Sequence, residues 1–478
     1  RDEYLITNDV LCKSETRARI LELYLNGVIP DSFSLIKKIF KVIQFFLKNT
    51  VWFLLYLLAK LAHFLSNQRY DITGIKELHA LDVFFVIPNI INQKIFKDVY
   101  LTGLTETLDK IGKDYVYIPR WFGSWNPFDF FKAFRIIKKA KHPVLVEFQI
   151  LELSDYVRAL LYLATYPFHL RTFAQGLGVS DEDRILGFSL WETLDTVTIR
   201  NYLSFLYGKR ISCLRDLKVK CISWYENQAS NKTLYRGLRH VPGKVKIYGA
   251  QLFLAPSTLL NIIPDEAEIR FGVLPDKILV NGRGCSLRLK HIFEAVGPSL
   301  RYAKLFHTQT DPSNGDIVLV LLPYWDHAIK NILNLIRGIK WSVPVVIKFH
   351  PAVEKSSYSS QILSKFLVTD EDLYVLFKRA QVAVGCSSGA LVEAMCLGIP
   401  VVDIVDPKQF VHNYMPAEEK GILWDKAVHE EDINLILKRF EEVLRVNPSL
   451  FRERGERIRD MLFCKPTDEQ IVSAFDLA

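Results

Sequence analysis

The sequence is poor in cysteine, and the cysteines that it has form no recognisable pairs. Seven are spread irregularly over 478 positions, and no C-x-x-C motif occurs: Cys12, Cys213, Cys221, Cys285, Cys386, Cys396 and Cys464. An odd number at irregular spacing argues against a disulfide framework and against a structural zinc site. We therefore expect a chain suited to a reducing, cytoplasmic environment.

Several common functional motifs are also absent. The sequence has no G-x-x-x-x-G-K-[ST] phosphate loop, no H-E-x-x-H zinc motif and no G-x-S-x-G nucleophile elbow. Asp403 and Asp406 do not form a D-x-D pair, so we expect no bound metal ion. No basic stripe with interleaved aromatic residues occurs, which argues against nucleic-acid binding. No secretory signal-peptide pattern is visible.

Charge of either sign is not in large excess. Lys and Arg number 61 against 53 Asp and Glu, a formal net charge of +8. This mild surplus suits an anionic partner such as a sugar nucleotide, an acidic glycan or an anionic lipid surface. With 49% apolar and 24% charged residues, the composition is that of an ordered globular protein, and the length allows two or three domains.

The most unusual composition lies near the N-terminus, at residues 34–68. Four polar residues recur there at spacings of four, three and four, which places them on one helical face: Lys37, Lys41, Gln44 and Lys48. Apolar residues cover the remaining surface, so the pattern predicts an amphipathic helix. The uncharged stretch 49–59 is shorter than the about 20 residues that a single membrane span needs.

We expect this segment to lie in a membrane interface with its lysines toward anionic headgroups. Two alternatives are open, a helix pair packed on the folded domain that follows and a contact within an oligomer. Residues 1–30, before it, predict a short helical or irregular lead-in.

From about residue 70 onward, short apolar runs alternate with amphipathic stretches, the pattern of a parallel sheet with helices on its faces. The predicted strands of a first unit are 81–87, 115–118, 144–148, 219–224, 245–249 and 277–281. Those of a second unit are 316–323, 343–349, 381–385 and 399–404.

The turn-rich segment 311–315 is the predicted linker between the two units. We therefore divide the chain into an N-terminal helical segment (1–69), a first α/β domain (70–312) and a second one (313–478). Ligands of open α/β sheets bind beyond the carboxyl ends of the strands, so the active site is expected in the cleft between the domains.

The first functional motif follows the strand 343–349. Pro351 ends this strand, which places His350 at its carboxyl end, facing the predicted cleft. His350 and the nearby Lys348 can donate hydrogen bonds to a phosphate or to a leaving nucleotide. A histidine that only bonds a loop would show the same pattern.

The second motif, GCSSGALVEA, opens a helix directly after the strand 381–385. The free backbone N–H groups of the helix start, with the hydroxyls of Ser387 and Ser388 beside Gly389, form an anion site. Glu393, about one and a half turns into the helix, is placed to accept hydrogen bonds from ribose hydroxyls. The alternative is an ordinary serine-capped helix.

Together the two motifs resemble the HP and serine–serine motifs of bacterial sialyltransferases and Kdo transferases, GT-B enzymes that use CMP-activated acidic sugars. In those families the histidine contacts the nucleotide phosphate and the serines hold it from the helix start. The resemblance implies these roles for His350, Ser387 and Ser388. The stretch SSGALVEAMCLGIPVV is also similar to the donor-domain signature of surface-carbohydrate transferases, where a glutamate at the place of Glu393 binds ribose.

The first domain adds a further resemblance, to bacterial surface-carbohydrate biosynthesis proteins. It is carried by four elements in the same order: Glu226-Asn227-Gln228, Gly249-Ala250-Gln251, Pro275 to Gly282, and Arg301-Tyr302. The similarity covers roughly residues 221–402 and departs where the family more often has G-Y-Q-H, because no histidine follows Gln251 here. Asn227, Gln251 and the nearby Arg236 are the residues expected on the acceptor side.

Two carboxylates are candidates for catalysis. Glu226 lies at the carboxyl end of the strand 219–224, across the predicted cleft from His350, where it could act as general base on an acceptor hydroxyl in an inverting transfer. Asp326, after the strand 316–323, would be the nucleophile if the transfer retained configuration. Either carboxylate could instead be solvated or cap a helix.

The resemblance implies a GT-B fold of the α/β class, with two Rossmann-like domains facing across a cleft, and a glycosyltransferase activity. The expected donor is a CMP-activated acidic sugar such as Kdo or a sialic-acid relative, which is a substrate, so no cofactor is expected. The expected acceptor is a lipid-linked, lipopolysaccharide or capsule glycan. The protein would be peripheral at the cytoplasmic face of the bacterial inner membrane, held through residues 34–68, and a homo-oligomer or an assembly complex is compatible with this.

Three alternatives stay open. The same fold could use a UDP-sugar, a GDP-sugar or CDP-glycerol as donor. A UDP-sugar epimerase would leave the membrane-seeking segment 34–68 unexplained. A noncatalytic scaffold of a polysaccharide assembly complex would not need Glu226 or His350.

Overall fold

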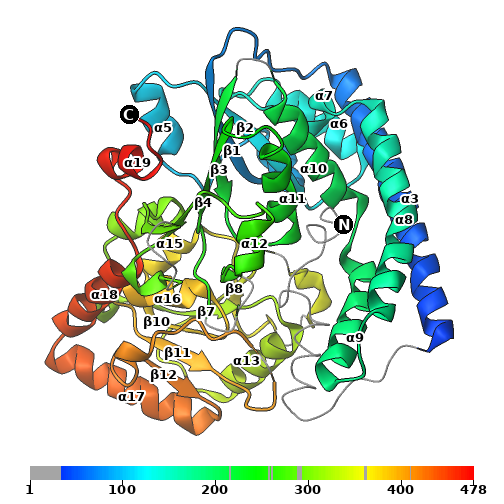
Figure 1. The fold of residues 1–478 in the computed structure, drawn as a ribbon. Coiled ribbons are helices and arrows are strands. Elements are labelled where there is room, and N and C mark those ends of the chain that lie inside the picture. The colour runs from blue at the N-terminus through cyan, green and yellow to red at the C-terminus, as the bar shows by residue number, and fades with distance from the viewer. Residues whose placement is uncertain are drawn as a thin grey trace.

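The computed structural model describes residues 34–478, apart from 215–216, 257–258, 260–261, 288–292, 352, 360–362 and 410, with side chains given for all of these except 182, 185, 189 and 196. The lead-in expected at residues 1–30 lies outside the described residues. The chain forms two lobes, each built on a parallel sheet, and a layer of long helices flanks the first lobe (Figure 1).

Among the described residues, the first sheet has the strand order β2-β1-β3-β4-β5-β6, and every neighbouring pair is parallel. Its strands are β1 (Glu77–Val86), β2 (Tyr115–Phe122), β3 (Lys218–Trp224), β4 (Val245–Ala250), β5 (Lys277–Val280) and β6 (Glu294–Val296). The chain order reverses between β1 and β3. The carboxyl ends of these two strands are therefore the switch point at which open sheets bind ligands.

The second sheet has the order β12-β11-β10-β7-β8-β9, again with parallel neighbours in the part that the structure describes. Its strands are β7 (Ile317–Leu322), β8 (Val345–Phe349), β9 (Leu367–Val368), β10 (Ala380–Gly385), β11 (Val401–Ile404) and β12 (Trp424–Ala427). Its switch point lies between β7 and β10. The α/β class and the two-domain arrangement expected from the sequence are thereby confirmed.

Helices pack on the faces of both sheets, which is why the central strands are apolar on both sides. Those of the first lobe are α4 (Ile87–Gln93), α5 (Leu104–Lys110), α6 (Pro127–Ile137), α7 (Glu147–Ile150), α8 (Leu153–Gln175), α9 (Asp181–Thr196), α10 (Ile199–Ser212), α11 (Ala229–Leu238) and α12 (Glu266–Arg270). Those that follow β7 are α13 (Asp326–Gly338), α15 (Leu373–Phe377), α16 (Gly389–Cys396), α17 (Glu430–Val446), α18 (Ser449–Leu462) and α19 (Asp468–Ala474).

Two helices of the first lobe cross at very close range. At Gly208 of α10, an added Cβ would lie 2.6 Å from the backbone oxygen of Leu234, and at Gly237 of α11 it would collide with the backbone oxygen of Phe205. Only glycine allows this approach, and it fixes α10 beside α11, next to the switch point of the first sheet.

The expected helix near the N-terminus is present as α3 (Leu35–Ser66), a single helix of 32 residues. Its N-cap Ser34 accepts a hydrogen bond from the backbone N–H of Lys37. The helix packs along α6, α7, α8 and α9, with Phe45, Tyr56 and Ala59 buried against them. The segment therefore packs on the folded domain, as in one of the alternatives left open by the sequence, but as one continuous helix rather than a helix pair.

The predicted orientation toward headgroups is wrong for Lys41 and Lys48 of α3, whereas Lys37 is exposed. Lys41 forms ion pairs with Glu192 at 2.8 Å and with Asp195 at 2.6 Å, and Lys48 donates to the backbone oxygen of Leu194 at 2.7 Å. These lysines face the protein because α9 offers acidic and carbonyl partners there. The exposed side of the helix is apolar instead.

A strand predicted at 144–148 is also not formed. Only Val144 makes a bridge, to Tyr117 at the edge of the sheet. The chain then turns into α7, where the carboxylate of Glu147 is buried and accepts a hydrogen bond from Trp121 Nε1 at 2.9 Å.

Each lobe has its own apolar core, but the C-terminal end of the chain returns to the first lobe (Figure 1). Ile471, Phe475 and Leu477 are buried in the first core, and α19 packs on α5. Asp468 of α19 pairs with Lys110 at 2.6 Å. The second lobe thus ends before α19, earlier than the predicted boundary at 478.

Candidate active site

The site is built where the switch points of the two sheets face the gap between the lobes. β3 and β4 end there in the first lobe, and β7, β8 and β10 end there in the second. Gly389 lies against the first lobe, since a Cβ at this position would be 3.9 Å from Leu254. The start of α16, which carries the serine–serine motif, therefore lies against the segment that follows β4.

The turn between β10 and α16 presents polar groups at a helix start. Ser388 is the N-cap of α16, and its hydroxyl accepts from the backbone N–H of Ala390 at 3.3 Å. Ser387 has a positive φ of 48°, which is unusual for a residue other than glycine. Its side chain is buried, and its Oγ has no hydrogen-bond partner in the described structure. A strained residue with an unused hydroxyl at a helix start suits a bound anion.

His350 directly follows β8, and its backbone N–H donates to the oxygen of Leu322 at 3.1 Å. Its imidazole is exposed and lies 5.8 Å from the ring of Tyr324. Crowding by the surrounding protein, and then the positive charge of Arg301, lower the pKa of His350. The ring is therefore mostly neutral at pH 7, able to donate one hydrogen bond.

Arg301 is a site residue that the motifs alone did not single out. It is exposed to solvent, yet side chains of both lobes surround it. Its guanidinium donates to the backbone oxygen of Leu252 at 3.1 Å and lies 5.6 to 5.7 Å from the rings of Trp224 and Tyr100. The Arg301-Tyr302 element of the first-domain resemblance was the signal that pointed to it. This cation can neutralise a phosphate in the cleft.

Glu393 lies on α16, facing the cleft side chains of its own lobe. Tyr374 donates to its carboxylate at 2.5 Å. Burial raises the pKa of Glu393, while the Tyr374 hydrogen bond and the charge of Arg301 oppose the shift. Its polar pairing and its position in the motif fit the expected ribose contact.

Glu226 lies in the loop after β3, with 9% of its surface exposed. Burial, and then the nearby Glu226 carboxylate, raise the pKa of Tyr414 to about 12, while Arg301 opposes the shift. Tyr414 belongs to the second lobe, so the charges of Glu226 and Arg301 act on a side chain across the lobe boundary. Glu226 also lines a cavity of about 480 Å³ at the switch point of the first sheet.

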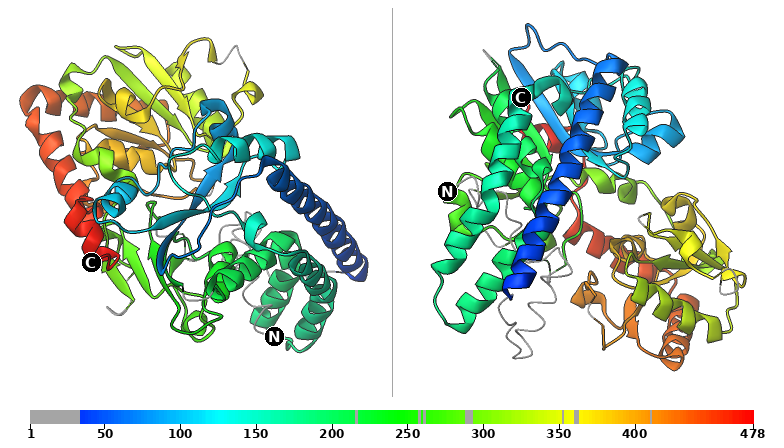
Figure 2. Two further views of the ribbon diagram at one scale, coloured as in Figure 1. Left: turned by 90° about the horizontal axis from the view of Figure 1, so that it is seen from above. Right: turned by 90° about the vertical axis from the view of Figure 1, so that its right-hand side faces the viewer.

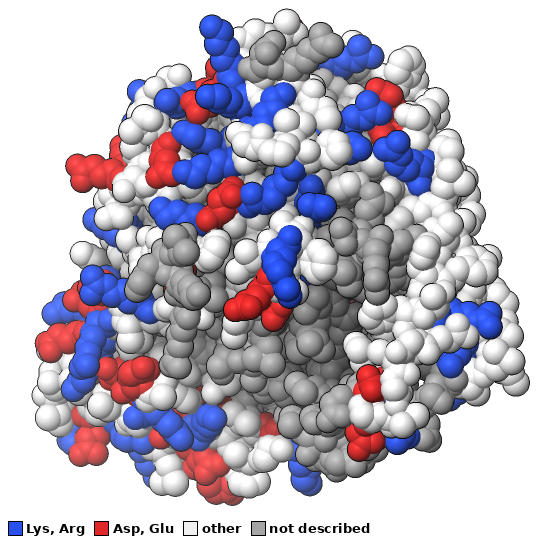
Figure 3. Space-filling model, viewed as in Figure 1, with Lys and Arg blue, Asp and Glu red and all other residues white. Residues whose placement is uncertain are grey.

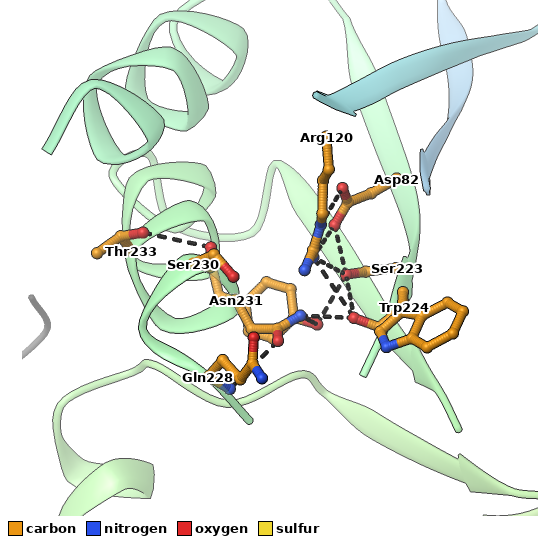
Figure 4. Close-up of polar contacts among 9 residues, drawn as sticks. Asp82, Arg120, Ser223, Trp224, Gln228, Ser230, Asn231 and Thr233 are labelled. Atoms are coloured by element: carbon orange, nitrogen blue, oxygen red, sulfur yellow. Dashed lines mark hydrogen bonds and ion pairs between the residues drawn. The ribbon is translucent and has the colours of Figure 1, made fainter. Parts of the chain in front are cut away.

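A buried polar network forms part of the wall of that cavity, and its contacts are drawn in Figure 4. Arg120 of β2 and Asp82 of β1 form a bidentate ion pair, with Arg120 Nε 2.6 Å from Asp82 Oδ1. Ser223 donates to the same carboxylate at 2.6 Å, and Asn231 Nδ2 donates to the backbone oxygen of Trp224 at 2.5 Å. These contacts join three strands and α11 at the switch point. Sequence reasoning missed them, because their members are up to 149 positions apart (82 to 231).

The other predicted residues of the second lobe have contacts of a different kind. Asp326 is the first residue of α13, where it pairs with Lys330 at 2.7 Å and accepts from Tyr358 at 2.9 Å. The hydrogen bonds from Lys330 and Tyr358 lower its pKa. Lys348 donates to the backbone oxygen of Glu371 at 2.6 Å. The side chains of Asp326 and Lys348 therefore form contacts within the second lobe.

The three predicted acceptor-side residues differ in their placement. Asn227, beside Glu226, has a φ of 53°, and its amide donates to Glu268 at 3.1 Å. Gln251 is buried and accepts from the backbone N–H of Asn281 at 3.4 Å. Arg236 lies in the last turn of α11, about 10 Å along the helix from its cleft end at 1.5 Å per residue. Asn227 directly follows Glu226, and Gln251 directly follows Ala250, which pairs with Trp224, so both lie near this candidate carboxylate.

No cluster of three or more metal-ligating side chains occurs among the described residues.

The chain is similar to several solved structures at low identity. They include the wall teichoic acid polymerase TagF (11% identity, 93% of this chain and 98% of that chain, TM-score 0.38), TarM (12%, 85% and 100%, 0.40) and Anabaena HepE in complex with UDP-glucose (10%, 84% and 100%, 0.40). No protein-family model and no curated protein matches the chain. Because these TM-scores are below 0.5, the function is inferred below from the side chains of this chain.

Proposed function

We propose that the protein is a GT-B glycosyltransferase that moves a sugar from a nucleotide-activated donor to a glycan acceptor held at a membrane. The observation that carries this proposal is that Arg301 lies against Trp224 and Tyr100 near Glu226, while the start of α16 in the other lobe approaches Leu254. A base on one side and an anion site on the other are what transfer from a phosphate leaving group requires.

In the proposed reaction, Glu226 takes the proton of an acceptor hydroxyl as its oxygen attacks the anomeric carbon of the donor. The bond from that carbon to the phosphate oxygen breaks, and the phosphate leaves with the electron pair. The N–H groups at the start of α16, the hydroxyls of Ser387 and Ser388, and the Arg301 guanidinium stabilise its charge. His350 donates a hydrogen bond to the same phosphate.

We propose a CMP-activated acidic sugar, such as Kdo or a sialic-acid relative, as the donor. The HP and serine–serine motifs support this choice, since they follow β8 and β10, the strands on either side of β7 in the second sheet. A sugar carboxylate adds negative charge, which suits a cleft with Arg301 at its centre. Because Asp326 is paired at a helix start, the proposal uses Glu226 alone as the catalytic carboxylate.

Thermal unfolding with CMP, CDP, UDP and GDP tests the donor class. A nucleotide at 100 times its Kd adds about 2.7 kcal/mol to the free energy of unfolding. We expect CMP to stabilise the protein most. Stabilisation by none of the four nucleotides would contradict the proposal. Stabilisation by UDP or GDP alone would show that the donor carries that nucleotide instead of CMP.

The proposed membrane contact is the apolar face shared by α3 and α8, which lie side by side in the right panel of Figure 2. On α3 the exposed residues follow a helical stripe: Ile36, Phe40, Ile43, Leu47, Val51, Leu54, Leu58, Leu61 and Leu65. On α8 they are Leu153, Val157, Leu161 and Phe168. α3 contains no acidic residue, and this edge of the molecule is largely uncharged in Figure 3.

By length and composition α3 could cross a bilayer, and only 22% of its most apolar window is buried. Because the helix also packs on the protein along its length, we propose that it lies in the membrane surface rather than across it. The lobes would then sit at the cytoplasmic face of a bacterial inner membrane, where a lipopolysaccharide or capsule acceptor is made.

Flotation with phosphatidylglycerol vesicles tests this contact. The double variant Leu54→Glu/Leu58→Glu should lose binding, because two charges would enter the apolar layer. The matched control is Leu435→Glu/Val446→Glu, which changes two exposed apolar residues of α17 in the second lobe. Equal binding by both variants would contradict the proposed surface.

A further inference from the structure

The cavity beside Glu226 has the position and size of a second ligand site. It opens at the switch point between β1 and β3, and its walls come from α3, β1, β2, α7, α10, α11 and the loop after β3. Its volume of about 480 Å³ lies within the range of about 300 to 1,000 Å³ that is typical of small-molecule sites. The anion site at the start of α16 belongs to the other lobe, so the two sites are distinct.

The walls combine aromatic rings with neutral polar groups. The aromatic side chains on the cavity include Trp52, Phe84 and Phe122. The neutral polar side chains include Asn201, Ser204, Gln228 and Ser230. Sugars offer C–H faces that pack on aromatic rings and hydroxyls that exchange hydrogen bonds with amides and hydroxyls. The lining therefore has the chemistry of a saccharide site.

Both arginines on the cavity wall are already engaged. Arg120 is bound to Asp82, and Arg200 donates to the backbone oxygen of Trp121 at 2.7 Å while lying 5.6 Å from the ring of Trp125. With these partners in place, the wall offers a phosphate little charge. This favours a neutral sugar over an anionic group.

The cavity also touches the proposed membrane helix. Trp52 and Tyr56 of α3 line it, whereas Leu54 and Leu58 of the same helix point outward and are 53% and 45% exposed. Only one helix, about 10 Å in diameter, therefore separates the cavity from the apolar face. A sugar in the cavity would lie close to the membrane surface.

From this geometry we infer that the cavity binds the acceptor saccharide of a short glycolipid, whose sugar lies near its lipid anchor. The inference rests on the proposed function for the reaction itself. It adds the class of acceptor and the residues that hold it. Glu226 stands at the border between the cavity and the interlobe space, where it meets the hydroxyl that such a sugar presents.

Saturation-transfer NMR with octyl glycosides tests this binding directly. The probes are the octyl glycosides of glucose, galactose, mannose and N-acetylglucosamine, below their micelle concentrations, with octanol as the sugar-free probe. The wild-type protein should transfer saturation to the ring protons of at least one glycoside. Ser204→Trp, which fills the cavity from α10, should remove that signal, and Trp52→Ala should weaken binding about tenfold, equivalent to about 1.4 kcal/mol.

The matched control is Ser154→Trp, the same change at an exposed position at the start of α8, outside the cavity. It should keep the ring-proton signal. If Ser204→Trp does not fold, Asn201→Leu replaces it as the cavity variant. The inference is overturned if no glycoside shows ring-proton transfer, if the cavity variants keep the signal, or if octanol binds as well as every glycoside.

Nucleotide binding separates this inference from the proposed function. The thermal shift with CMP depends on the second lobe and should be the same in Ser204→Trp and in the wild type. Loss of the nucleotide shift with intact glycoside binding would refute the transferase and leave the saccharide site. Loss of glycoside binding with an intact nucleotide shift would refute the saccharide site and leave the proposed transferase.

Discussion

Each lobe has its candidate site at the switch point of its sheet, but the two sites are formed by different parts of the chain. In the second lobe, the site is a short continuous segment, where a strand ends, Ser387 takes a positive φ and Ser388 caps α16. In the first lobe, the site is a cavity lined by side chains from seven parts of the chain and supported by the buried Asp82–Arg120 pair. A phosphate is held by backbone groups of any suitable helix start, whereas a sugar needs walls of specific shape.

The largest expected effect is on the rate of transfer, and it comes from Glu226 at the border between the two candidate sites. Glu226→Gln removes the proposed base while keeping the size of the side chain, so transfer should fall about 100- to 10,000-fold. Nucleotide binding should not change, because the anion site lies in the other lobe. Product formation and the CMP thermal shift measure the two effects. Turnover within threefold of the wild type would exclude Glu226 as the base.

The next largest effect is on the free energy of unfolding, and it comes from the Asp82–Arg120 pair in the wall of the first-lobe cavity. Asp82→Ala leaves Arg120 buried without its carboxylate, which should cost about 3 to 5 kcal/mol of unfolding free energy. Denaturant unfolding measures this loss. The control is Asp316→Ala in the second lobe, which breaks the exposed pair with Arg379 at 2.8 Å and should change stability little. Similar losses for both variants would remove the contrast between the lobes.

A pH effect should follow from one buried carboxyl in each lobe. Burial raises the pKa of Glu147 in the cavity wall, and that of Asp403 in β11, to about 7. The unfolded chain releases these protons near pH 4 and the folded one holds them, so each group lowers stability as the pH rises from about 4 to 7 and not beyond. For Glu147 the loss is up to about 3 kcal/mol.

Glu147→Gln should therefore remove up to about 3 kcal/mol of the fall in stability between pH 4 and 7. A glutamine oxygen can still accept the hydrogen bond of Trp121. Unfolding free energies measured across this pH range test the sign and the size. An unchanged slope would show that Glu147 is ionised in the folded protein at neutral pH.

The smallest expected effects, on stability and on nucleotide affinity, should differ between Ser387 and Ser388. Ser388→Ala removes the N-cap of α16 and should cost about 1 kcal/mol of stability. Ser387→Ala should leave stability unchanged, because its Oγ bonds nothing in the described structure, but should weaken nucleotide binding about tenfold. Thermal unfolding with and without CMP gives both quantities. A stability loss in Ser387→Ala without a change in affinity would make Ser387 structural.

Two wrong predictions in the first lobe show what a local sequence pattern does not determine. The lysines of α3 were expected to face headgroups because helical spacing gives a shared face but not its direction. Lys41 and Lys48 turn inward because α9 supplies Glu192, Asp195 and free carbonyl oxygens. Residues 144–148 are apolar like a strand, yet become α7 after one bridge, since Glu147 finds its partner in Trp121.

The sequence by itself determined the α/β class, the two lobes and the helix start capped by Ser388, because strand periodicity and a capped helix start depend on neighbours in the chain. Only the tertiary structure decided that Arg301 lies against Trp224 and Tyr100, that Gln251 is buried and bonded to Asn281, and that α3 exposes its apolar side. These features depend on contacts between residues far apart in the sequence, which no local pattern records.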